Sequence, residues 1–161
     1  MNSDRLYPTL LIIAGGAALA TASVAQYGFG FDPCVLCLYQ RVPFALAIVL
    51  GTVGLVRPRW LAVVFALAAL AFAANGVLAV YHVGVEQHLW VSAAGCGGQL
   101  PTQISVADLI ASLDQKRPKP CDAVDWTLFG VSMAGWNVVY SFALAGASAY
   151  VLRTHKWPRH R

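Results

Sequence analysis

The chain has 161 residues, of which 58% are hydrophobic and only 11% are charged. Soluble domains carry about 25% charged residues, so this composition excludes an ordinary soluble protein and predicts a single integral membrane domain over 1–161. The formal net charge of +4 does not indicate a nucleic-acid partner, because the basic residues flank apolar segments and form no stripe with interleaved aromatic residues.

Four segments are long enough to cross a bilayer, which takes about 20 apolar residues. They run over about 6–26, 38–56, 60–81 and 128–152. An alternative for the first segment is a signal peptide, but its apolar run is longer than a usual signal-peptide core, so we expect a retained helix. Asn75 and Asn137 need polar partners inside the bundle. Several glycines permit close helix packing: Gly15, Gly16, Gly51, Gly54 and Gly135.

The first outer loop, 27–37, contains a Cys-x-x-Cys pair, Cys34 and Cys37, at the edge of the second segment. This spacing lets a disulfide open and close locally and can hold one thiol as a thiolate. A purely structural bridge is disfavoured, because two intervening residues close almost no loop. We therefore expect a redox dithiol with access to a lipid-soluble partner. Arg41, one helical turn after Cys37, is either an interfacial anchor or a group that stabilises a thiolate or a reduced quinone oxygen.

The second outer loop, 82–127, is too long for an ordinary connection, and loops of this length are usually functional. Cys96 and Cys121 lie in it. Apolar residues repeat at helical spacing between 106 and 113, which predicts a short amphipathic helix at the membrane interface. A structural disulfide is a fair alternative for this second pair. A four-thiolate zinc site is disfavoured, because one Cys-x-x-Cys with two single cysteines departs from the usual paired pattern. No metal is expected, since His82, Glu86 and His88 are explained equally well as interfacial polar residues.

The basic residues predict the orientation. With four spans, seven of them share the side of the termini and four share the other side, which places both termini in the cytoplasm. Both cysteine pairs then face an oxidising compartment, where disulfides persist. The seven are Arg5, Arg57, Arg59, Arg153, Lys156, Arg159 and Arg161, and the four are Arg41, Lys116, Arg117 and Lys119.

The stretch from Pro33 to Arg41, Pro-Cys-Val-Leu-Cys-Leu-Tyr-Gln-Arg, resembles the signature of the DsbB family of bacterial disulfide-bond formation proteins. The resemblance covers nearly the whole chain and includes the number of spans. Further matching positions are Tyr81-His82-Val83-Gly84-Val85-Glu86, Cys121, Trp126, Phe129-Gly130, Met133 and Trp136-Asn137.

The resemblance implies an all-α protein of the bacterial inner membrane, a four-transmembrane-helix bundle with the interfacial helix in its second periplasmic loop. It also implies an enzyme that reoxidises DsbA, a soluble periplasmic thiol oxidase, and reduces a membrane quinone, either ubiquinone or menaquinone. In the family's scheme, DsbA attacks a Cys96–Cys121 disulfide, Cys121 exchanges with Cys34, and Cys37 is released as a thiolate beside the quinone. The quinone pocket is expected around five residues: Arg41, His82, Leu78, Met133 and Trp136.

Two rival functions remain from the residues alone. An enzyme of the vitamin K epoxide reductase type also pairs a Cys-x-x-Cys with a quinone, but it carries the motif near a late helix, whereas here the motif precedes the second span. A membrane scaffold or metal carrier with structural cysteines is the rival from another class.

Overall fold

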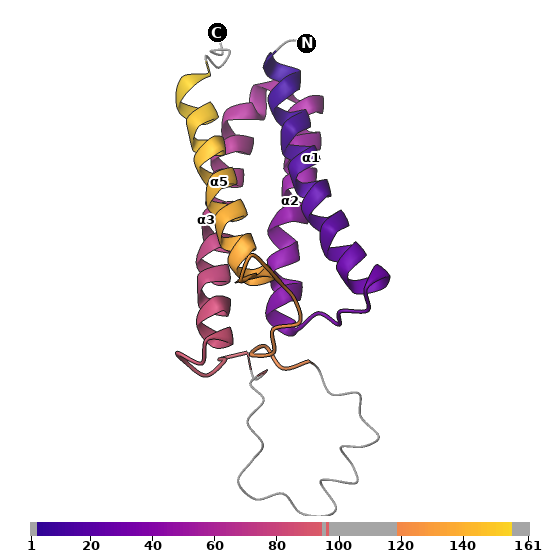
Figure 1. Ribbon diagram of the computed structural model, residues 1–161. Coiled ribbons are helices and arrows are strands. Elements are labelled where there is room, and N and C mark those ends of the chain that lie inside the picture. Colours follow the sequence, from indigo (N-terminus) through magenta and orange to yellow (C-terminus); the bar gives the residue numbers. More distant parts are fainter. Residues whose placement is uncertain (1–2, 95, 97–118, 156–161) are drawn as a thin grey trace, which may run out of the picture.

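The structure is a computed structural model, and it describes residues 3–94, 96 and 119–155. Four helices run side by side, and the two chain ends lie at the same end of the bundle (Figure 1). They are α1 (Ser3–Ser23), α2 (Val35–Val56), α3 (Leu61–Glu86) and α5 (Met133–Thr154). A π-helical turn, Val24–Gly28, continues α1, and a 3₁₀ turn, Pro58–Trp60, precedes α3. The predicted interfacial helix lies outside the described residues.

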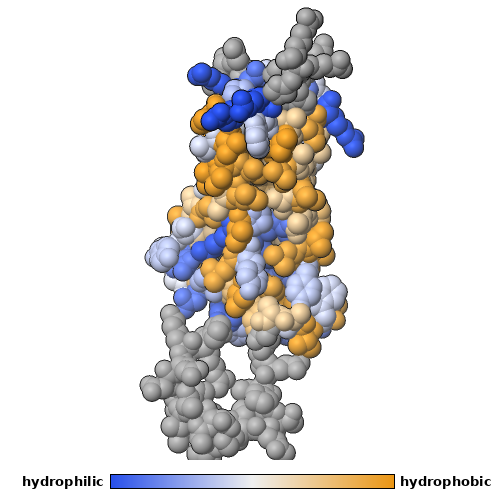
Figure 2. Space-filling model, turned by 180° about the vertical axis from the view of Figure 1, so that it is seen from behind, coloured by the Kyte–Doolittle hydropathy of each residue, from blue (hydrophilic) through white to orange (hydrophobic). Residues whose placement is uncertain are grey.

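Three segments of the described chain are long and apolar enough to cross a membrane: Ser3–Gly28, Val35–Val56 and Pro58–Glu86. The protein is therefore a multi-pass membrane protein. α5 has 22 residues but is not among these segments. Its sequence is interrupted by polar residues, including Asn137, Ser141 and Ser148. Figure 2 shows hydrophilic residues gathered at the end that carries the termini, with an apolar band beside them.

α1 packs against α2 at glycine contacts. A Cβ at Gly15 would lie 2.5 Å from the carbonyl oxygen of Phe44, and one at Gly51 would lie 2.7 Å from the carbonyl oxygen of Pro8. Only glycine permits this approach of two backbones. Leu11, Phe44 and Phe72, from three different helices, belong to the same buried core cluster. The predicted close packing is confirmed for these two glycines, whereas Gly16 has no atom within 4 Å of its Cβ position.

α3 packs against α5 through polar as well as apolar groups. The Asn75 side-chain nitrogen donates to Ser141 Oγ at 2.9 Å, and Ser141 donates to Asn137 Oδ1 at 3.0 Å. Asn75 and Ser141 are almost fully buried. The prediction that Asn75 and Asn137 find polar partners inside the bundle is confirmed.

The last helix begins later than the sequence predicts. Residues Thr127–Leu128 (β1) and Val131–Ser132 (β2) form a small antiparallel hairpin, so helix α5 starts at Met133 and not near 128. Phe129 and Gly130 both have positive φ angles, 52° and 76°, as a two-residue hairpin loop of the primed type requires. The expectation of a purely α-helical chain is wrong at this point, because phenylalanine gives no sequence signal for that conformation.

The other helix ends also shift. α3 continues to Glu86, so His82 lies within the helix and not after it. α2 begins at Val35 and therefore contains Cys37 and Arg41 in its first two turns. The four expected segments are each represented by a helix, with boundaries displaced by a few residues.

Candidate redox site

Cys34 and Cys37 lie at the N-terminus of α2. Cys34 is the N-cap residue, and its Sγ accepts the backbone N–H of Cys37 at 3.2 Å. The two sulfur atoms are 2.8 Å apart and both residues are free cysteines. Cys34 is buried and Cys37 is half-buried. A helix N-terminus favours negative charge, so this position suits a thiolate.

His82 reaches the pair from α3. Its Nε2 lies 3.6 Å from Cys34 Sγ, and its Nδ1 lies 3.0 Å from the amide nitrogen of Gln40. The Gln40 oxygen accepts from Asn137 Nδ2 at 2.6 Å, so its nitrogen is left to donate to His82 Nδ1. In the neutral imidazole the proton then lies on Nε2, and His82 donates to the Cys34 sulfur.

These contacts lower the pKa of Cys34 to about 4. The largest cause is the hydrogen bond from the Cys37 thiol; His82 and the backbone N–H of Cys37 act in the same direction, whereas burial opposes them. In the reduced pair, Cys34 is therefore the sulfur that carries the negative charge at neutral pH.

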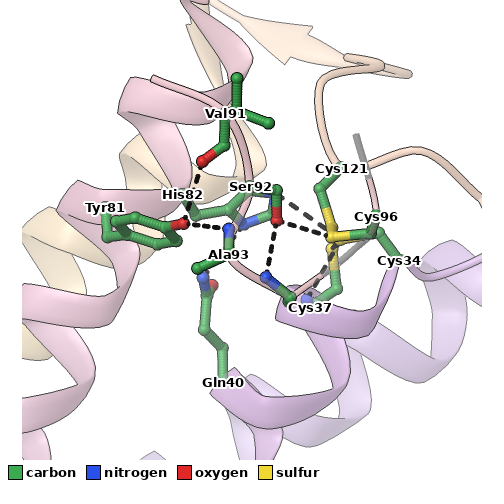
Figure 3. Close-up of a disulfide and its surroundings, with 11 residues drawn as sticks. Cys34, Cys37, Gln40, Tyr81, His82, Val91, Ser92, Ala93, Cys96 and Cys121 are labelled. Atoms are coloured by element: carbon green, nitrogen blue, oxygen red, sulfur yellow. Dashed lines mark hydrogen bonds between the residues drawn. A yellow bond between two sulfur atoms is a disulfide. The ribbon is translucent and has the colours of Figure 1, made fainter. Parts of the chain in front are cut away.

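The second cysteine pair lies directly against the first. Cys96 and Cys121 form a disulfide, and both are buried in one cluster with Cys34, Leu36 and Val85. Figure 3 shows the disulfide close to the first turn of α2, where Cys34 and Cys37 are drawn. The backbone N–H of Cys121 donates to the carbonyl of Cys96 at 2.6 Å. Two sulfur pairs that are far apart in sequence thus share one buried site.

The chain after α3 folds back on the helix end and supports Cys96. Trp90 stacks on Tyr81, with ring centroids 5.9 Å apart, and its indole N–H donates to the carbonyl of Tyr81. The Tyr81 hydroxyl accepts the backbone N–H of Ala93 at 2.7 Å. Ser92, between these anchors, brings its Oγ to 3.0 Å from Cys96 Sγ (Figure 3).

A cavity of about 490 Å³ opens beside the dithiol. Cys34, Cys37, Arg41, His82, Met133 and Trp136 all line it, as the sequence expectation requires of a shared pocket. Leu78 does not line this cavity and packs against the cysteine cluster instead. Cys96 and Cys121 also lie behind the cavity wall, in that cluster.

Arg41 joins the cavity to the end of α1. Its Nη1 donates to Gln26 Oε1 at 2.7 Å, and its Nη2 donates to the carbonyl of Ala22 at 3.5 Å. The guanidinium has five N–H donors, so these two bonds leave donor capacity for a ligand oxygen. Arg41 therefore anchors α2 to the end of α1 and also reaches the cavity beside the Cys-x-x-Cys pair.

Three residues of the site were not singled out from the sequence. Gln40 orients His82, Gln26 holds Arg41, and Glu86 lines the cavity while its carboxylate accepts from Ser132 Oγ at 2.5 Å. The sequence signal for these three residues is a polar side chain in or beside an apolar span, because such a group needs a hydrogen-bond partner inside a bilayer.

The cavity suits a mostly apolar molecule that carries a few polar oxygens. Ligand pockets typically enclose about 300–1,000 Å³ and combine apolar walls with few polar groups. Here alanines of α1, Phe44 and Trp136 supply apolar wall, while Arg41 and His82 supply donors. A quinone head group has this chemistry, so the residues present fit that cofactor class.

Comparison with known proteins agrees with this geometry. The family profile "Disulfide bond formation protein DsbB" matches residues 4–151. "Disulfide bond formation protein B" of Xanthomonas campestris pv. campestris is 31% identical over 159 residues, covering 91% of this chain and 89% of the relative. The protein of the same name from Haemophilus influenzae is 28% identical, covering 85% and 80%. "Uncharacterized protein RP370" of Rickettsia prowazekii is 25% identical, covering 84% and 80%. No solved structure matches. The chain therefore belongs to the DsbB family of membrane disulfide-bond formation proteins, which are disulfide oxidoreductases.

Proposed function

We propose that this protein reoxidises a DsbA-like periplasmic thiol oxidase and passes the electrons to a membrane quinone. Two cysteine pairs pack in one buried site beside a cavity of about 490 Å³, and this single observation carries the proposal. The net reaction converts a DsbA dithiol and a quinone to a DsbA disulfide and a quinol. Two electrons and two protons move from the dithiol to the quinone.

The protein's own cysteines carry the electrons through a series of thiol–disulfide exchanges. A DsbA thiolate attacks Cys96, forming a mixed disulfide and releasing the Cys121 thiolate. The Cys121 thiolate attacks the Cys34–Cys37 disulfide at Cys34 and releases the Cys37 thiolate. The second DsbA thiol displaces Cys96 and leaves DsbA oxidised, and the Cys96 thiolate then attacks Cys121 and releases Cys34, so that the Cys96–Cys121 disulfide is restored and the Cys34–Cys37 pair is reduced. The shared burial of Cys34, Cys96 and Cys121 supports this exchange, because the three residues pack in one cluster.

The cavity residues hold the acceptor and the charge. The bound quinone supplies a two-electron acceptor for the Cys37 sulfur. Arg41 would donate a hydrogen bond to a ring oxygen of the quinone, and His82 carries a proton at Nε2 beside the sulfur pair. Met133 and Trp136 line the same cavity and supply part of its apolar wall. The strong thiolate stabilisation at Cys34 makes this sulfur a good leaving group when Cys96 displaces it from Cys121.

The proposal includes the placement of the chain. Both termini lie in the cytoplasm and α5 forms a fourth span, so that the cysteines face the periplasm across a bacterial inner membrane. The common position of the two chain ends supports this arrangement (Figure 1). α5 has 22 residues, about 33 Å at 1.5 Å each, which is about the thickness of the bilayer core.

The test is a quinone-reduction assay with reduced DsbA and detergent-purified protein, run with ubiquinone and with menaquinone analogues. We expect quinol formation with the parent protein and none with Cys34→Ser or Cys37→Ser. Full activity in either variant would exclude this pair as the donor to the quinone. Retention of α-helical circular dichroism in both variants is the control for folding.

A further inference from the structure

Three metal-binding side chains converge at the dithiol. Cys34 Sγ, Cys37 Sγ and a ring nitrogen of His82 all lie within 4.8 Å of one another, and they come from two different helices. Cys34 and His82 are 4% and 3% exposed. Two thiolates and an imidazole are the ligands of many zinc sites. A four-thiolate site, in contrast, is not available while Cys96 and Cys121 are joined.

The separations suit a tetrahedral thiophilic cation. Zinc–sulfur and zinc–nitrogen bonds of about 2.3 and 2.0–2.1 Å place a sulfur and a nitrogen ligand about 3.6 Å apart. Cys34 Sγ and His82 Nε2 are 3.6 Å apart. The two sulfurs, at 2.8 Å, must separate by about 1 Å to reach the spacing of two thiolate ligands. Cys37 is half-buried at the cavity wall, where its side chain has room to turn.

The surroundings complete the site. A metal-bound His82 needs its Nε2 lone pair free and a proton on Nδ1, so Gln40 must present its oxygen there. Reversing the amides of Gln40, Asn137 and Asn75 achieves this. Asn75 Oδ1 is a buried atom with no hydrogen-bond partner among the described residues. After the reversal it accepts hydrogen bonds from the Ser141 hydroxyl and from the Asn137 amide. The hydrogen-bond chain can therefore run in either direction, toward His82 or away from it, and in both cases one side-chain atom of Asn75 is left without a partner among the described residues.

We propose that the reduced Cys34–Cys37 pair and His82 form a binding site for a thiophilic divalent cation such as Zn²⁺ or Cd²⁺. All three ligand residues line the cavity, which the side chains of Glu86, Asp125, Arg41 and Lys119 also line. Binding releases the proton of the Cys37 thiol and involves no change of oxidation state. The ion occupies both sulfurs, so it competes with thiol–disulfide exchange and inhibits the reduced enzyme only.

The test is a cadmium titration of the full-length, detergent-purified protein with Cys96→Ser and Cys121→Ser, so that one dithiol remains. Ultraviolet thiolate-to-cadmium absorption and elemental analysis measure the bound ion. We expect one ion per chain in the reduced protein and none after oxidation of Cys34 and Cys37. Because neither DsbA nor quinone is present, failure here is separate from failure of the proposed function.

Three single variants test whether His82 is a ligand of the bound ion. His82→Ala removes a direct ligand and should weaken cadmium binding by more than the roughly 10–100-fold that loss of an outer partner costs. Gln40→Ala keeps all three ligands and should weaken it by about 10–100-fold. His88→Ala is the matched control, because His88 lies just beyond the same helix with its side chain 75% exposed, and its affinity should equal that of the parent. Parent-like affinity in His82→Ala, or cadmium retained by the oxidised protein, would overturn the proposal.

Discussion

Gly15 and Gly16 are neighbours in α1 with opposite surroundings, and they make a matched pair for testing the packing. A Cβ at Gly15 would lie 2.5 Å from the Phe44 carbonyl oxygen, 3.1 Å from Ile48 Cγ1 and 3.3 Å from Ala47 Cβ. A Cβ at Gly16 would have no atom within 4 Å. We predict that Gly15→Ala destabilises the fold and that Gly16→Ala does not.

The magnitudes follow from these distances. The contact with the Phe44 oxygen is about 0.9 Å inside the 3.4 Å at which ordinary contact begins, and a backbone atom cannot turn aside. Overpacking of this kind costs about 1–3 kcal/mol. Gly16→Ala instead gains about 0.5–1 kcal/mol, because glycine loses the most backbone entropy in a helix. We therefore expect the two free energies of unfolding to differ by about 1.5–4 kcal/mol.

The assay is detergent-driven unfolding followed by circular dichroism, with parent, Gly15→Ala and Gly16→Ala measured in parallel. α1 also holds Arg41 through Gln26 and Ala22, so Gly15→Ala should raise the apparent quinone KM, while Gly16→Ala leaves it unchanged. Equal stabilities of the two variants would refute the close contact between α1 and α2. A loss of stability in Gly16→Ala alone would place the wrong face of α1 against α2.

Three further predictions concern the redox site. Cys121→Ser should accumulate a mixed disulfide between Cys96 and DsbA, visible on non-reducing gels, because the unpaired Cys96 thiol exchanges with a DsbA disulfide and no second thiol of the loop can resolve the adduct; accumulation on Cys121 in a Cys96→Ser variant would instead reverse the order of the pair. Arg41→Ala should raise the apparent quinone KM by about one to two decades, since a charge-assisted contact is worth roughly 1.5–3 kcal/mol. Arg57→Ala, at the opposite end of α2, is its control, and an unchanged KM in Arg41→Ala would reduce Arg41 to an anchor for α1. In the reduced pair, the thiolate ultraviolet absorption of Cys34 should persist from pH 8 to pH 5 and disappear near pH 4, the value to which its pKa is lowered. Because this pKa lies below that of an ordinary thiol, about 8.5, the thiolate's contribution to stability is complete above that value and is lost as the pH falls through about 4. His82→Ala should move the titration to higher pH, and an unchanged curve would show that His82 does not stabilise the thiolate.

Local patterns in the sequence predicted the family and the four long helices that the described residues form. The Cys-x-x-Cys spacing of Cys34 and Cys37 is a property of four consecutive residues, and long apolar runs reflect only the thickness of a bilayer. The family resemblance rests on such local motifs, and the family profile bears it out over residues 4–151. Helix boundaries were less certain, because Phe129 adopts a left-handed conformation that its residue type does not favour.

Only the tertiary structure decided which side chains meet. Gln40 and His82 are 42 residues apart, and Gln40 and Asn137 are 97 apart, yet they form one buried hydrogen-bond chain that ends at Cys34. The same applies to Gly15 and Gly16, which are identical in sequence terms and opposite in surroundings. The reason is geometric: the rotation of each helix about its axis and its displacement along its neighbour determine these contacts. Packing of all the helices together sets both quantities, and no pattern within one apolar segment encodes them.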